Sequence, residues 1–507
     1  MGLFKPKREH LKVLFVGTEC VPFARVGGLG SIMYSLPRAL RNIGHDARVM
    51  IPRYLDINDG AFHLSTEYEG LKVPTDNEDG PEFLICNIKK YNGQGAKDPA
   101  PIYFLENQEY YEQRANVYGY ADDPVRWALL SRGVLEFLTH SSWVPQVIVA
   151  NDWQTGFLIN YLKTTYRDHP IISKIACVFV IHNLFHQGMF DHKFVQEMDF
   201  DDGHSPIPGF NQPRLLRVNG MRRGIMHADM ISTVSPTYAR EIMTEEYGEL
   251  LHDLLKERRA LLYGILNGLD YDVWDPATDP YIASNFSVAS LGNRGKNKTV
   301  LQERFGLPAD PKAFVLGGVG RLDNQKGVDL LFPIAEALFK DLPIQLIIVG
   351  EGDTGIMANF YKLEKEYPDK VATHLKFDGI LPHLVFAGAD AVVVPSRFEP
   401  SGLTQMEAMR FGAVPIIRKT GGLADTVQDY CPQKNIGTGF TFTKSDPLFL
   451  MTAIVRALES YRHQDQWHLL QKRAMQQDFS WEHSAKEYVD LFARAIDMRS
   501  RSESAML

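Results

Sequence analysis

The sequence predicts an α/β protein built from two Rossmann-like domains. Short apolar strands alternate with helical patterns along the whole chain, which is typical of parallel sheets covered by helices. A chain of 507 residues is also too long for one ordinary core. Each half contains a Gly-Gly-Leu turn, at Gly27–Leu29 and Gly421–Leu423. This weak internal repeat predicts two domains that face each other, with ligands in a cleft at the carboxyl ends of both sheets.

The first half contains a series of candidate strands, most of them followed by a turn and a helix. Helices are expected at 31–43, 154–163 and 237–246. The polar segment 57–97 lacks a helical period and is interpreted as an insertion of one or two hairpins, and the irregular segment 192–212 as a loop over a site. The expected strands are Leu11–Gly17, Ala47–Ile51, Ile102–Leu105, Val147–Ala150, Ala176–Ile181 and Met230–Val234.

The second half repeats the alternation after a polar stretch, Ser290–Lys298, which is the best candidate for a linker. From Asp446 onward the pattern is helical, with a last helix at Ser484–Met498 and a polar tail that is expected to fray. The expected strands are Phe314–Gly318, Ile344–Val349, Ala372–Phe377, Ala391–Val394 and Val414–Ile417. The predicted organisation is an N-terminal domain at 1–285, a linker at 286–299, a C-terminal domain at 300–475, and a helix at 476–507 that returns to the N-terminal domain and ends in the frayed tail.

Composition narrows the classes of function. A net charge of −8 and a pI near 6.1 argue against nucleic acid as a partner. The four cysteines are far apart and lack metal-site spacing, so free thiols in a reducing compartment, no metal and no cofactor are expected. No apolar run approaches the roughly 20 residues of a membrane span. The sequence therefore predicts a cytoplasmic protein without a membrane partner, or a plastid protein if a transit peptide has been removed. It does not indicate an oligomeric state.

The strongest local signal lies between Val392 and Gly422. A β-branched strand ends at Pro395, and the turn that follows carries Glu399. Ser401–Thr404 then opens a helix that contains Glu407. Free N–H groups at a helix start favour the binding of phosphate. A site for phosphate alone would not need the two carboxylates. The combination predicts a site for a phosphorylated sugar, although either acid could instead be a solvated surface residue.

Two cations flank another turn that follows a strand. Arg321 and Lys326 come shortly after the strand expected at Phe314–Gly318. Arginine can grip phosphate in a bidentate manner, and lysine can act as a point charge. The alternative is that the two side chains pair with Asp323 or Glu351 on the surface.

The first half offers three further candidates at the ends of strands. The turn Arg25–Gly30 has a phosphate-loop appearance, but it lacks the full dinucleotide-binding pattern and could be purely structural. Asp152 follows a buried strand and could either line a cleft or cap the next helix. His182 ends the strand Ala176–Ile181, where either a substrate contact or a satisfied structural histidine would fit.

The chain resembles the family of bacterial glycogen synthases and plant starch synthases, which are retaining glucosyltransferases. The resemblance covers about Lys12 to Ala495. The motifs that carry it are Ala24–Leu29, Asn151–Thr155, Ile181–Leu184, Val234–Ala239, Gly264–Asp270, Gly320–Leu322, Gln325–Gly327, Pro395–Gln405 and Asp478–Trp481.

The resemblance implies a GT-B fold and a metal-free transfer of glucose from a nucleoside-diphosphate glucose, with ADP-glucose favoured, to the non-reducing end of an α-1,4-glucan. The implied partners are a nucleotide-sugar donor and an α-glucan or oligosaccharide acceptor. The donor diphosphate would be bound by Arg321 and Lys326, and the transferred glucose by Glu399. The implied catalytic residues are Glu399, His182, Arg321, Lys326 and Asp152, and the implied substrate-binding residues are Arg25, Gly27, Gly28, Asn267, Phe377, Ser401, Gly402, Leu403, Thr404 and Glu407.

The sequence departs from the family pattern at several of these positions, and the departures concern donor recognition. Two alternatives stay open: a GT-B enzyme with a different small-sugar acceptor, and a catalytically silent glucan-binding scaffold. The departures are Arg25 for Lys, Ser31 for Asp, Asn151 for His, Phe377 for a base-stacking Tyr, Ser401 for a frequent Cys and Glu407 for Tyr.

Overall fold

The computed structural model describes residues 10–93, 98–188 and 201–506 of the chain. The basic N-terminal segment and the first part of the loop expected at 192–212 lie outside these residues. The chain forms two compact units. Unit 1 comprises the chain up to Val234, the segment Ala239–Gly268 and the chain from Trp481 onward, and unit 2 comprises Ser235–Tyr238 and Leu269–Ser480.

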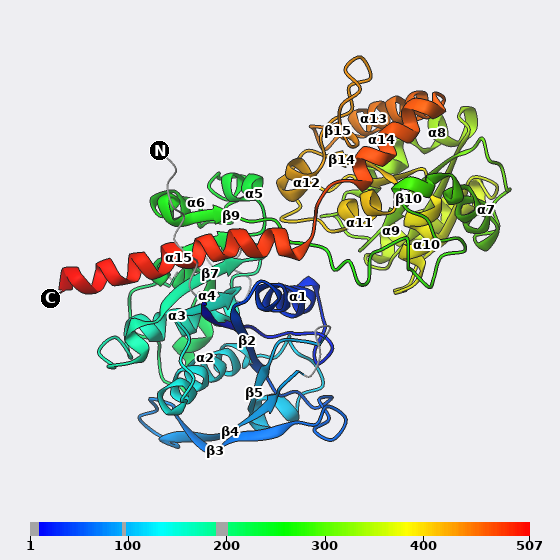
Figure 1. Cartoon of the computed structure of the whole chain (residues 1–507). Coiled ribbons are helices and arrows are strands. Elements are labelled where there is room, and N and C mark those ends of the chain that lie inside the picture. The colour runs from blue at the N-terminus through cyan, green and yellow to red at the C-terminus, as the bar shows by residue number, and fades with distance from the viewer. Residues whose placement is uncertain (1–9, 94–97, 189–200, 507) are drawn as a thin grey trace. The chain divides into compact units, whose positions relative to one another are not determined.

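Unit 1 is built on a sheet whose strand order is β3-β4-β5-β2-β1-β6-β7-β8-β9 (Figure 1). The pairs from β5 through β2, β1, β6, β7 and β8 to β9 are parallel, whereas β3, β4 and β5 pair in the antiparallel sense. The strands are β1 (Lys12–Val16), β2 (Asp46–Pro52), β3 (Ser65–Pro74), β4 (Phe83–Tyr91), β5 (Ile102–Glu106), β6 (Val147–Asn151), β7 (Ala176–Ile181), β8 (Met230–Thr233) and β9 (Leu262–Gly264).

The central strands of unit 1 read as almost continuous apolar runs, because helices cover both faces of a parallel sheet. Every residue of β6 and β7 is buried. The hairpin β3–β4 forms within the segment that the sequence marks as an insertion. The helices of this unit are α1 (Gly28–Asn42), α2 (Asp123–His140), α3 (Gly156–Lys163), α4 (Gly220–His227), α5 (Pro236–Glu241, which begins in unit 2), α6 (His252–Glu257) and α15 (Trp481–Met506).

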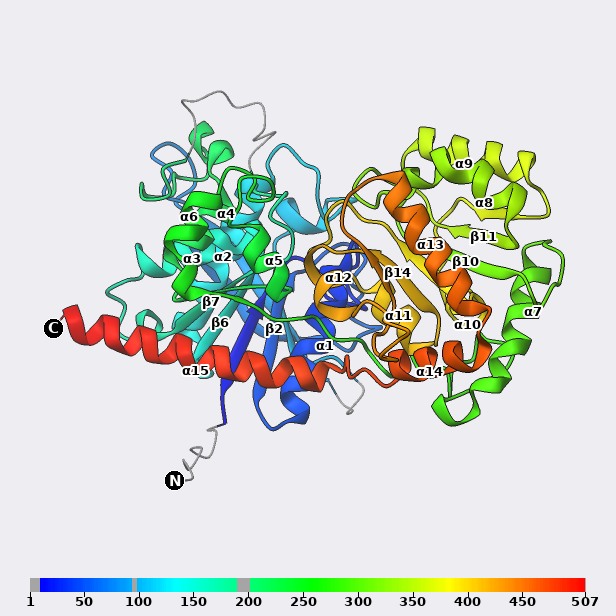
Figure 2. The same ribbon diagram turned by 90° about the horizontal axis from the view of Figure 1, so that it is seen from above.

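Unit 2 is built on a parallel sheet with the order β12-β11-β10-β13-β14-β15. In Figure 2 helix α13 crosses one face of this sheet, and its apolar side belongs to the same core as β10, β11 and β14. The strands are β10 (Phe314–Val319), β11 (Ile344–Val349), β12 (Val371–His374), β13 (Ala391–Val394), β14 (Val414–Arg418) and β15 (Phe440–Phe442). The helices are α7 (Arg294–Arg304), α8 (Ala335–Asp341), α9 (Thr354–Glu366), α10 (Leu381–Gly388), α11 (Thr404–Arg410), α12 (Gly421–Thr426), α13 (Pro447–Tyr461) and α14 (Gln464–Met475).

Both units have the switch point of a doubly wound sheet. In unit 1 the order reverses between β1 and β6, and in unit 2 it reverses between β10 and β13. Ligands of such sheets bind outside the carboxyl ends of the strands at this point. The prediction of two Rossmann-like domains is confirmed. Ligand sites are therefore expected at the loops after β1, β6 and β7 in unit 1 and at those after β10 and β13 in unit 2.

The structure corrects three expectations from the sequence. The stretch 286–299, expected to be a linker, forms a 3-10 turn at Val288–Asn293 and the start of α7, and it belongs to unit 2. The helix expected at 237–246 ends at Glu241. The tail expected to fray continues as helix to Met506, in α15, which packs against α1 and β7 of unit 1. Within the described residues no helix is long and apolar enough to cross a membrane.

Candidate active site

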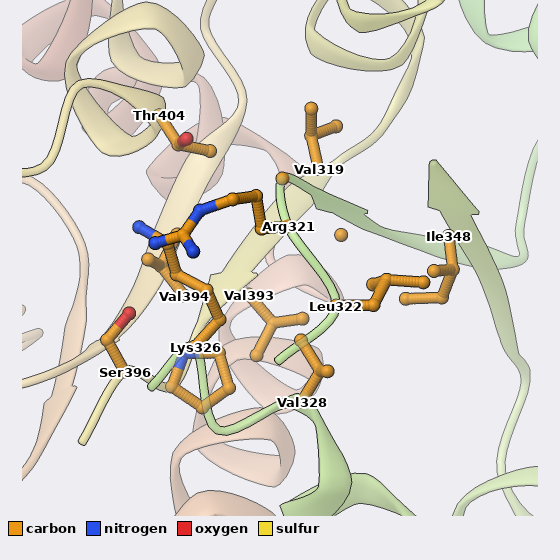
Figure 3. A pocket seen from close by; sticks show the side chains of 13 residues that line it. Val319, Arg321, Leu322, Lys326, Val328, Ile348, Val393, Val394, Ser396 and Thr404 are labelled. Atoms are coloured by element: carbon orange, nitrogen blue, oxygen red, sulfur yellow. The ribbon is translucent and has the colours of Figure 1, made fainter. Parts of the chain in front are cut away.

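The loops at the switch point of unit 2 enclose a pocket of about 350 Å³, open solvent included. Arg321 and Lys326 come from the loop after β10, whereas Ser396 and Thr404 come from the segment after β13 (Figure 3). The pocket floor is apolar and includes Val319 and other strand-end residues. The arrangement places two cations over the ends of adjacent strands, where a parallel sheet usually holds an anionic ligand.

The centre of this site is an ion pair between Lys326 and Glu399. Lys326 Nζ lies 2.6 Å from Glu399 Oε2, and Ser396 Oγ donates to the same oxygen at 3.0 Å. Glu399 is only 6% exposed. A buried carboxylate needs a partner of opposite charge and additional hydrogen bonds, and these two residues supply both. Glu399 is therefore an oriented carboxylate and not the solvated surface acid that the sequence left open.

Close backbone contacts between loops hold this pair in place. The Arg397 N–H donates to Gln325 O at 2.8 Å, which ties the loop after β13 to the loop after β10. Gly327 has φ +64, and a Cβ there would lie 2.3 Å from Pro395 O. At the next turn, a Cβ on Gly422 would lie 1.8 Å from Ser401 O. Only glycine fits at these two contacts, so the sequence fixes the loops that carry Lys326 and Glu399.

Arg321 is the more accessible cation of the pocket. Its side chain is 64% exposed, and its guanidinium contacts Asp323 at 2.6 Å and Gln325 Oε1 at 3.2 Å. The surface pairing with Asp323 that the sequence left open is thus present. An exposed ion pair contributes little to stability, so an anionic ligand can draw Arg321 away at low cost.

Of the other predicted residues of unit 2, those between Ser401 and Glu407 lie after β13 and on α11, whereas Phe377 follows β12, two strands away from β10 in the sheet. Gly402, at φ +67, lies two residues before α11, which begins at Thr404. Glu407 lies within the first turn of α11 and is partly buried. Phe377 is 72% exposed after β12, where its N–H donates to Glu351 at 3.2 Å. Ser401 and Leu403 complete the predicted set and are both partly buried.

In unit 1 the structure brings together Asp152 and His182, which follow the neighbouring strands β6 and β7. The Asp152 side chain does not cap the next helix, but accepts the backbone N–H of His182 at 2.8 Å and that of Asn183. Asp152 has φ +57 and ψ −177, a backbone conformation that non-glycine residues rarely adopt. Such strain persists where surrounding bonds determine it, and it is common at functional sites.

Loss of water shifts both side chains toward their neutral forms. Burial raises the pKa of Asp152 to about 7, against the N–H donors that favour its charged form. Burial lowers the pKa of the His182 imidazole to about 4, while the nearby Glu19 carboxylate acts in the opposite direction. A pKa of about 4 leaves His182 neutral across the physiological range, and two groups shifted in this way at the ends of adjacent strands are candidates for a functional site.

The predicted glycine turn of unit 1 is organised by a carboxylate that the sequence reasoning missed. Glu19 Oε2 accepts the N–H groups of Val26 at 2.7 Å and Gly27 at 2.9 Å, and Tyr118 donates to Oε1 at 2.6 Å. Glu19 stands two residues beyond the loop glycine after β1, and a polar residue at that end of a parallel strand was the signal. Two N–H groups of the turn are thus already occupied by the protein.

The other predicted residues of unit 1 lie on this turn and after β9. Arg25 is exposed, and no atom lies within 4 Å of the position that a Cβ would take on Gly27 or Gly28. The turn therefore faces open space that a ligand can enter. Asn267 is 4% exposed, in the loop after β9. Within the described residues no group of three or more His, Cys, Asp or Glu side chains could hold a metal ion.

Comparisons with known proteins identify the family. The model of the starch synthase catalytic domain matches residues 12–257, and the model of group 1 glycosyl transferases matches residues 300–470. The chain is 41% identical over 491 residues to the glycogen synthase of Thermotoga petrophila, covering 96% of this chain and 99% of the relative. It is 39% identical to the glycogen synthase of Desulforudis audaxviator, with 96% and 97% covered.

Solved structures give the same result. The catalytic domain of starch synthase IV from Arabidopsis thaliana, bound to ADP and acarbose, matches with a TM-score of 0.83 at 32% identity, covering 96% of this chain and 100% of that one. The Anabaena protein HepE, in complex with UDP and glucose, matches with a TM-score of 0.54 at 17% identity, covering 95% and 99%, and shares the fold alone. The chain therefore belongs to the glycogen synthase and starch synthase family and is a glycosyltransferase with the GT-B fold.

Proposed function

We propose that this enzyme transfers glucose from a nucleoside-diphosphate glucose, with ADP-glucose as the preferred donor, to the non-reducing end of an α-1,4-glucan and retains the anomeric configuration. The observation that carries the proposal is the Lys326–Glu399 pair beside Arg321 at the switch point of unit 2. A diphosphate needs the cations, and a sugar needs the carboxylate. The related starch synthase IV, bound to ADP and acarbose, supports the choice of donor and acceptor.

On the donor side, Arg321 and Lys326 bind the diphosphate and neutralise the charge that develops as the nucleoside diphosphate leaves. Glu399 accepts hydrogen bonds from hydroxyls of the transferred glucose. Glu407 binds the ribose, and Phe377 stacks on the base. Backbone groups near the start of α11 complete the donor site, at Ser401, Gly402, Leu403 and Thr404.

On the side of the transferred glucose, His182 contacts the sugar near its reacting carbon and Asp152 lines the same pocket. Asn267 frames this sugar. Arg25, Gly27 and Gly28 contact a phosphate or the acceptor at the open turn of unit 1. Because the Gly27 N–H already donates to Glu19, the Arg25 side chain is the group of this turn that would bind an anion.

The proposed chemistry needs no general base of the hydrolytic kind. The bond between the anomeric carbon and the phosphate oxygen breaks, and the acceptor hydroxyl oxygen bonds to the same carbon on the same face. The hydroxyl proton passes to the leaving phosphate. Exclusion of water matters in this scheme, because water would otherwise compete with the acceptor for the activated sugar.

The direct test is to incubate the enzyme with ADP-glucose and a maltooligosaccharide, and to measure both nucleotide release and chain elongation. We expect both, with a product that α-amylase degrades completely, which reports α-1,4 linkages. Nucleotide release with a small sugar but not with maltooligosaccharide would favour a different acceptor. Glucan binding without nucleotide release from any donor would favour the silent scaffold and overturn the proposal.

Donor tolerance is expected to be broader than for a strict ADP-glucose enzyme. Phe377 is 72% exposed and can stack on any base, but unlike the family tyrosine it has no hydroxyl. We expect UDP-glucose or GDP-glucose to be used at a detectable rate beside ADP-glucose. Phe377→Tyr is expected to increase the preference for ADP-glucose, measured as the ratio of kcat/KM values. Complete specificity of the unmodified enzyme for ADP-glucose would contradict this explanation.

Activity is expected to survive excess chelator. The proposed charge neutralisation comes from Arg321 and Lys326, and the described residues contain no cluster that could hold a metal ion. The measurement is the transfer rate with and without EDTA, after removal of bound ions. Loss of activity that Mg²⁺ or Mn²⁺ restores would show that a cation shares the role assigned here to the two side chains.

A further inference from the structure

The orientation of the Asn151 amide is fixed by its backbone partners. Asn151 is 2% exposed and ends β6. Its Nδ2 donates to Val16 O of β1 at 2.9 Å and to Val149 O at 3.3 Å. Both partners are carbonyl oxygens, which only accept hydrogen bonds, so they must face the NH₂ group. The Oδ1 of Asn151 consequently points toward His182, whose Nε2 lies 2.9 Å away.

This orientation determines where His182 carries its proton. An amide oxygen can only accept, so Nε2 must be the protonated nitrogen of the ring. Nδ1 is then an acceptor when the imidazole is neutral. It is inaccessible to solvent and has no hydrogen-bond partner within the residues that the structure describes. A buried acceptor without a partner is unfavourable, so its presence calls for an explanation.

The backbone and the ring of His182 are held by two consecutive residues of the neighbouring strand end. Strands β6 and β7 pair in parallel, with Asn151 opposite Val180. The Asp152 carboxylate accepts the His182 N–H at 2.8 Å, so two consecutive residues bind the histidine, one through its ring and one through its backbone. The charged or titratable groups near this pair are Asp152, Glu19 and His186. The ring of His182 thus has an uncharged partner in Asn151.

We propose that Asn151 is a positioning residue that fixes His182 as the Nε2–H tautomer, so that Nδ1 accepts a hydrogen bond from a hydroxyl of the bound sugar. The identity of the sugar rests on the proposed function, but the tautomer does not. Because Nδ1 is inaccessible to solvent in the free protein, a sugar hydroxyl can donate to it only after a neighbouring group moves aside on binding. A protonated imidazolium could not accept this bond, and the amide of Asn151, unlike a carboxylate, does not promote protonation.

The tautomer can be measured without any assay of activity. The full chain would be labelled with ¹⁵N-histidine, and the His182 signals assigned by comparison with His182→Gln. We expect a protonated Nε2 and an unprotonated Nδ1, unchanged between pH 5.5 and pH 8. On addition of ADP and maltotriose, the Nδ1 resonance should move in the direction of a hydrogen-bonded acceptor. A protonated Nδ1, a charged ring at pH 7, or an Nδ1 signal unaffected at saturating ligand would overturn the proposal.

The Asn151→Asp variant separates positioning from packing. A carboxylate at this position stabilises the imidazolium, so the His182 signals should titrate between pH 5 and pH 8. The transfer rate of this variant should then fall about tenfold from pH 8 to pH 6, in parallel with the titration of His182. The pH–rate profile of the unmodified enzyme should not show this decrease. A rate lowered equally at every pH would indicate a packing role and overturn the proposal. If the variant fails to fold, the tautomer of the unmodified protein still decides. Absence of glucosyl transfer would defeat the proposed function and leave the tautomer result intact.

Discussion

Replacing Lys326 with alanine is expected to lower the rate of glucose transfer by about 10²–10³, because one preorganised charge contact to the leaving group is lost. Lys326 lies in the pocket at the ends of β10 and β13, and it is the partner of Glu399 at 2.6 Å. Arg321→Ala should have an effect of the same order, since its guanidinium is the second cation of the pocket. The measurement is kcat with saturating ADP-glucose, together with the thermal midpoint Tm of each variant.

A matched control for these variants is Lys340→Ala. Lys340 is exposed, and among the described residues its ion pair is with Glu336, one helical turn away, at 3.4 Å. We expect unchanged turnover, because a surface pair of this kind contributes little. Unmodified turnover in Lys326→Ala and Arg321→Ala would remove both residues from the donor site.

Loss of Lys326 also leaves the buried Glu399 with Ser396 as its remaining partner. Removing one partner of a buried ion pair costs about 3–5 kcal/mol, so the effect of a lower Tm has to be separated from the loss of chemistry. The double variant Lys326→Met/Glu399→Gln removes the unpaired charge and restores neutrality. If this double variant regains the Tm of the unmodified protein and stays inactive, the loss of activity is chemical.

The strands of both sheets could be predicted from the sequence because parallel strands are buried on both faces. Such strands appear as short β-branched runs, as in Val147–Asn151 and Ile344–Val349. The linker prediction was wrong because it relied on polar composition. Arg294 of α7 is 6% exposed and donates to the carbonyl oxygens of Phe411 and Phe386, each at 3.0 Å. A segment whose polar side chains bind carbonyl oxygens inside a domain has the same composition as a linker, so composition alone does not distinguish the two.

The C-terminal tail shows the same limit for a different reason. The segment after Met498 is polar, and the sequence gives no apolar face that would hold it. Arg499 nevertheless donates to Ser173 O at 2.8 Å, a contact 326 residues away in sequence. Helix α15 thus continues past the expected end, because a partner remote in sequence stabilises it.

The candidate site could likewise be predicted only in part. Strand ends followed by His182, Asp152, Arg321 and Glu399 could be selected because a doubly wound sheet binds ligands there. The pairing of Lys326 with Glu399 spans 73 residues and could not be read from spacing. Glu19 was missed because a single acid beside a cysteine carries no motif, although its position after β1 gave a usable signal. The sequence marked Asn151 only as a departure from the family pattern, and the structure shows that it contacts His182.

Replacing Glu399 with glutamine is expected to lower kcat by about 10²-fold or more with little change in Tm. Glutamine keeps the volume of the side chain and can still accept from Ser396, so the loop should hold its shape. It loses the charge that orients Lys326, and it binds the hydroxyls of the transferred glucose more weakly than a carboxylate does. The first loss affects the leaving phosphate and the second affects the reacting sugar, so the effect should be on kcat more than on the KM for the donor.

Glu407→Gln is the matched control, because it makes the same change eight residues later in the same turn and helix. If Glu407 binds the ribose, its loss should raise the donor KM and leave kcat within about threefold, since uniform binding affects KM alone. Equal effects of the two substitutions, or an effect of Glu399→Gln on KM only, would contradict the separate roles proposed here.

The combined effect of Lys326→Met and Glu399→Gln should also be smaller than the product of the single effects, because each residue acts through a geometry that the other maintains. Two independent contacts would give the full product, so this cycle distinguishes a coupled pair from two separate ligands of the donor.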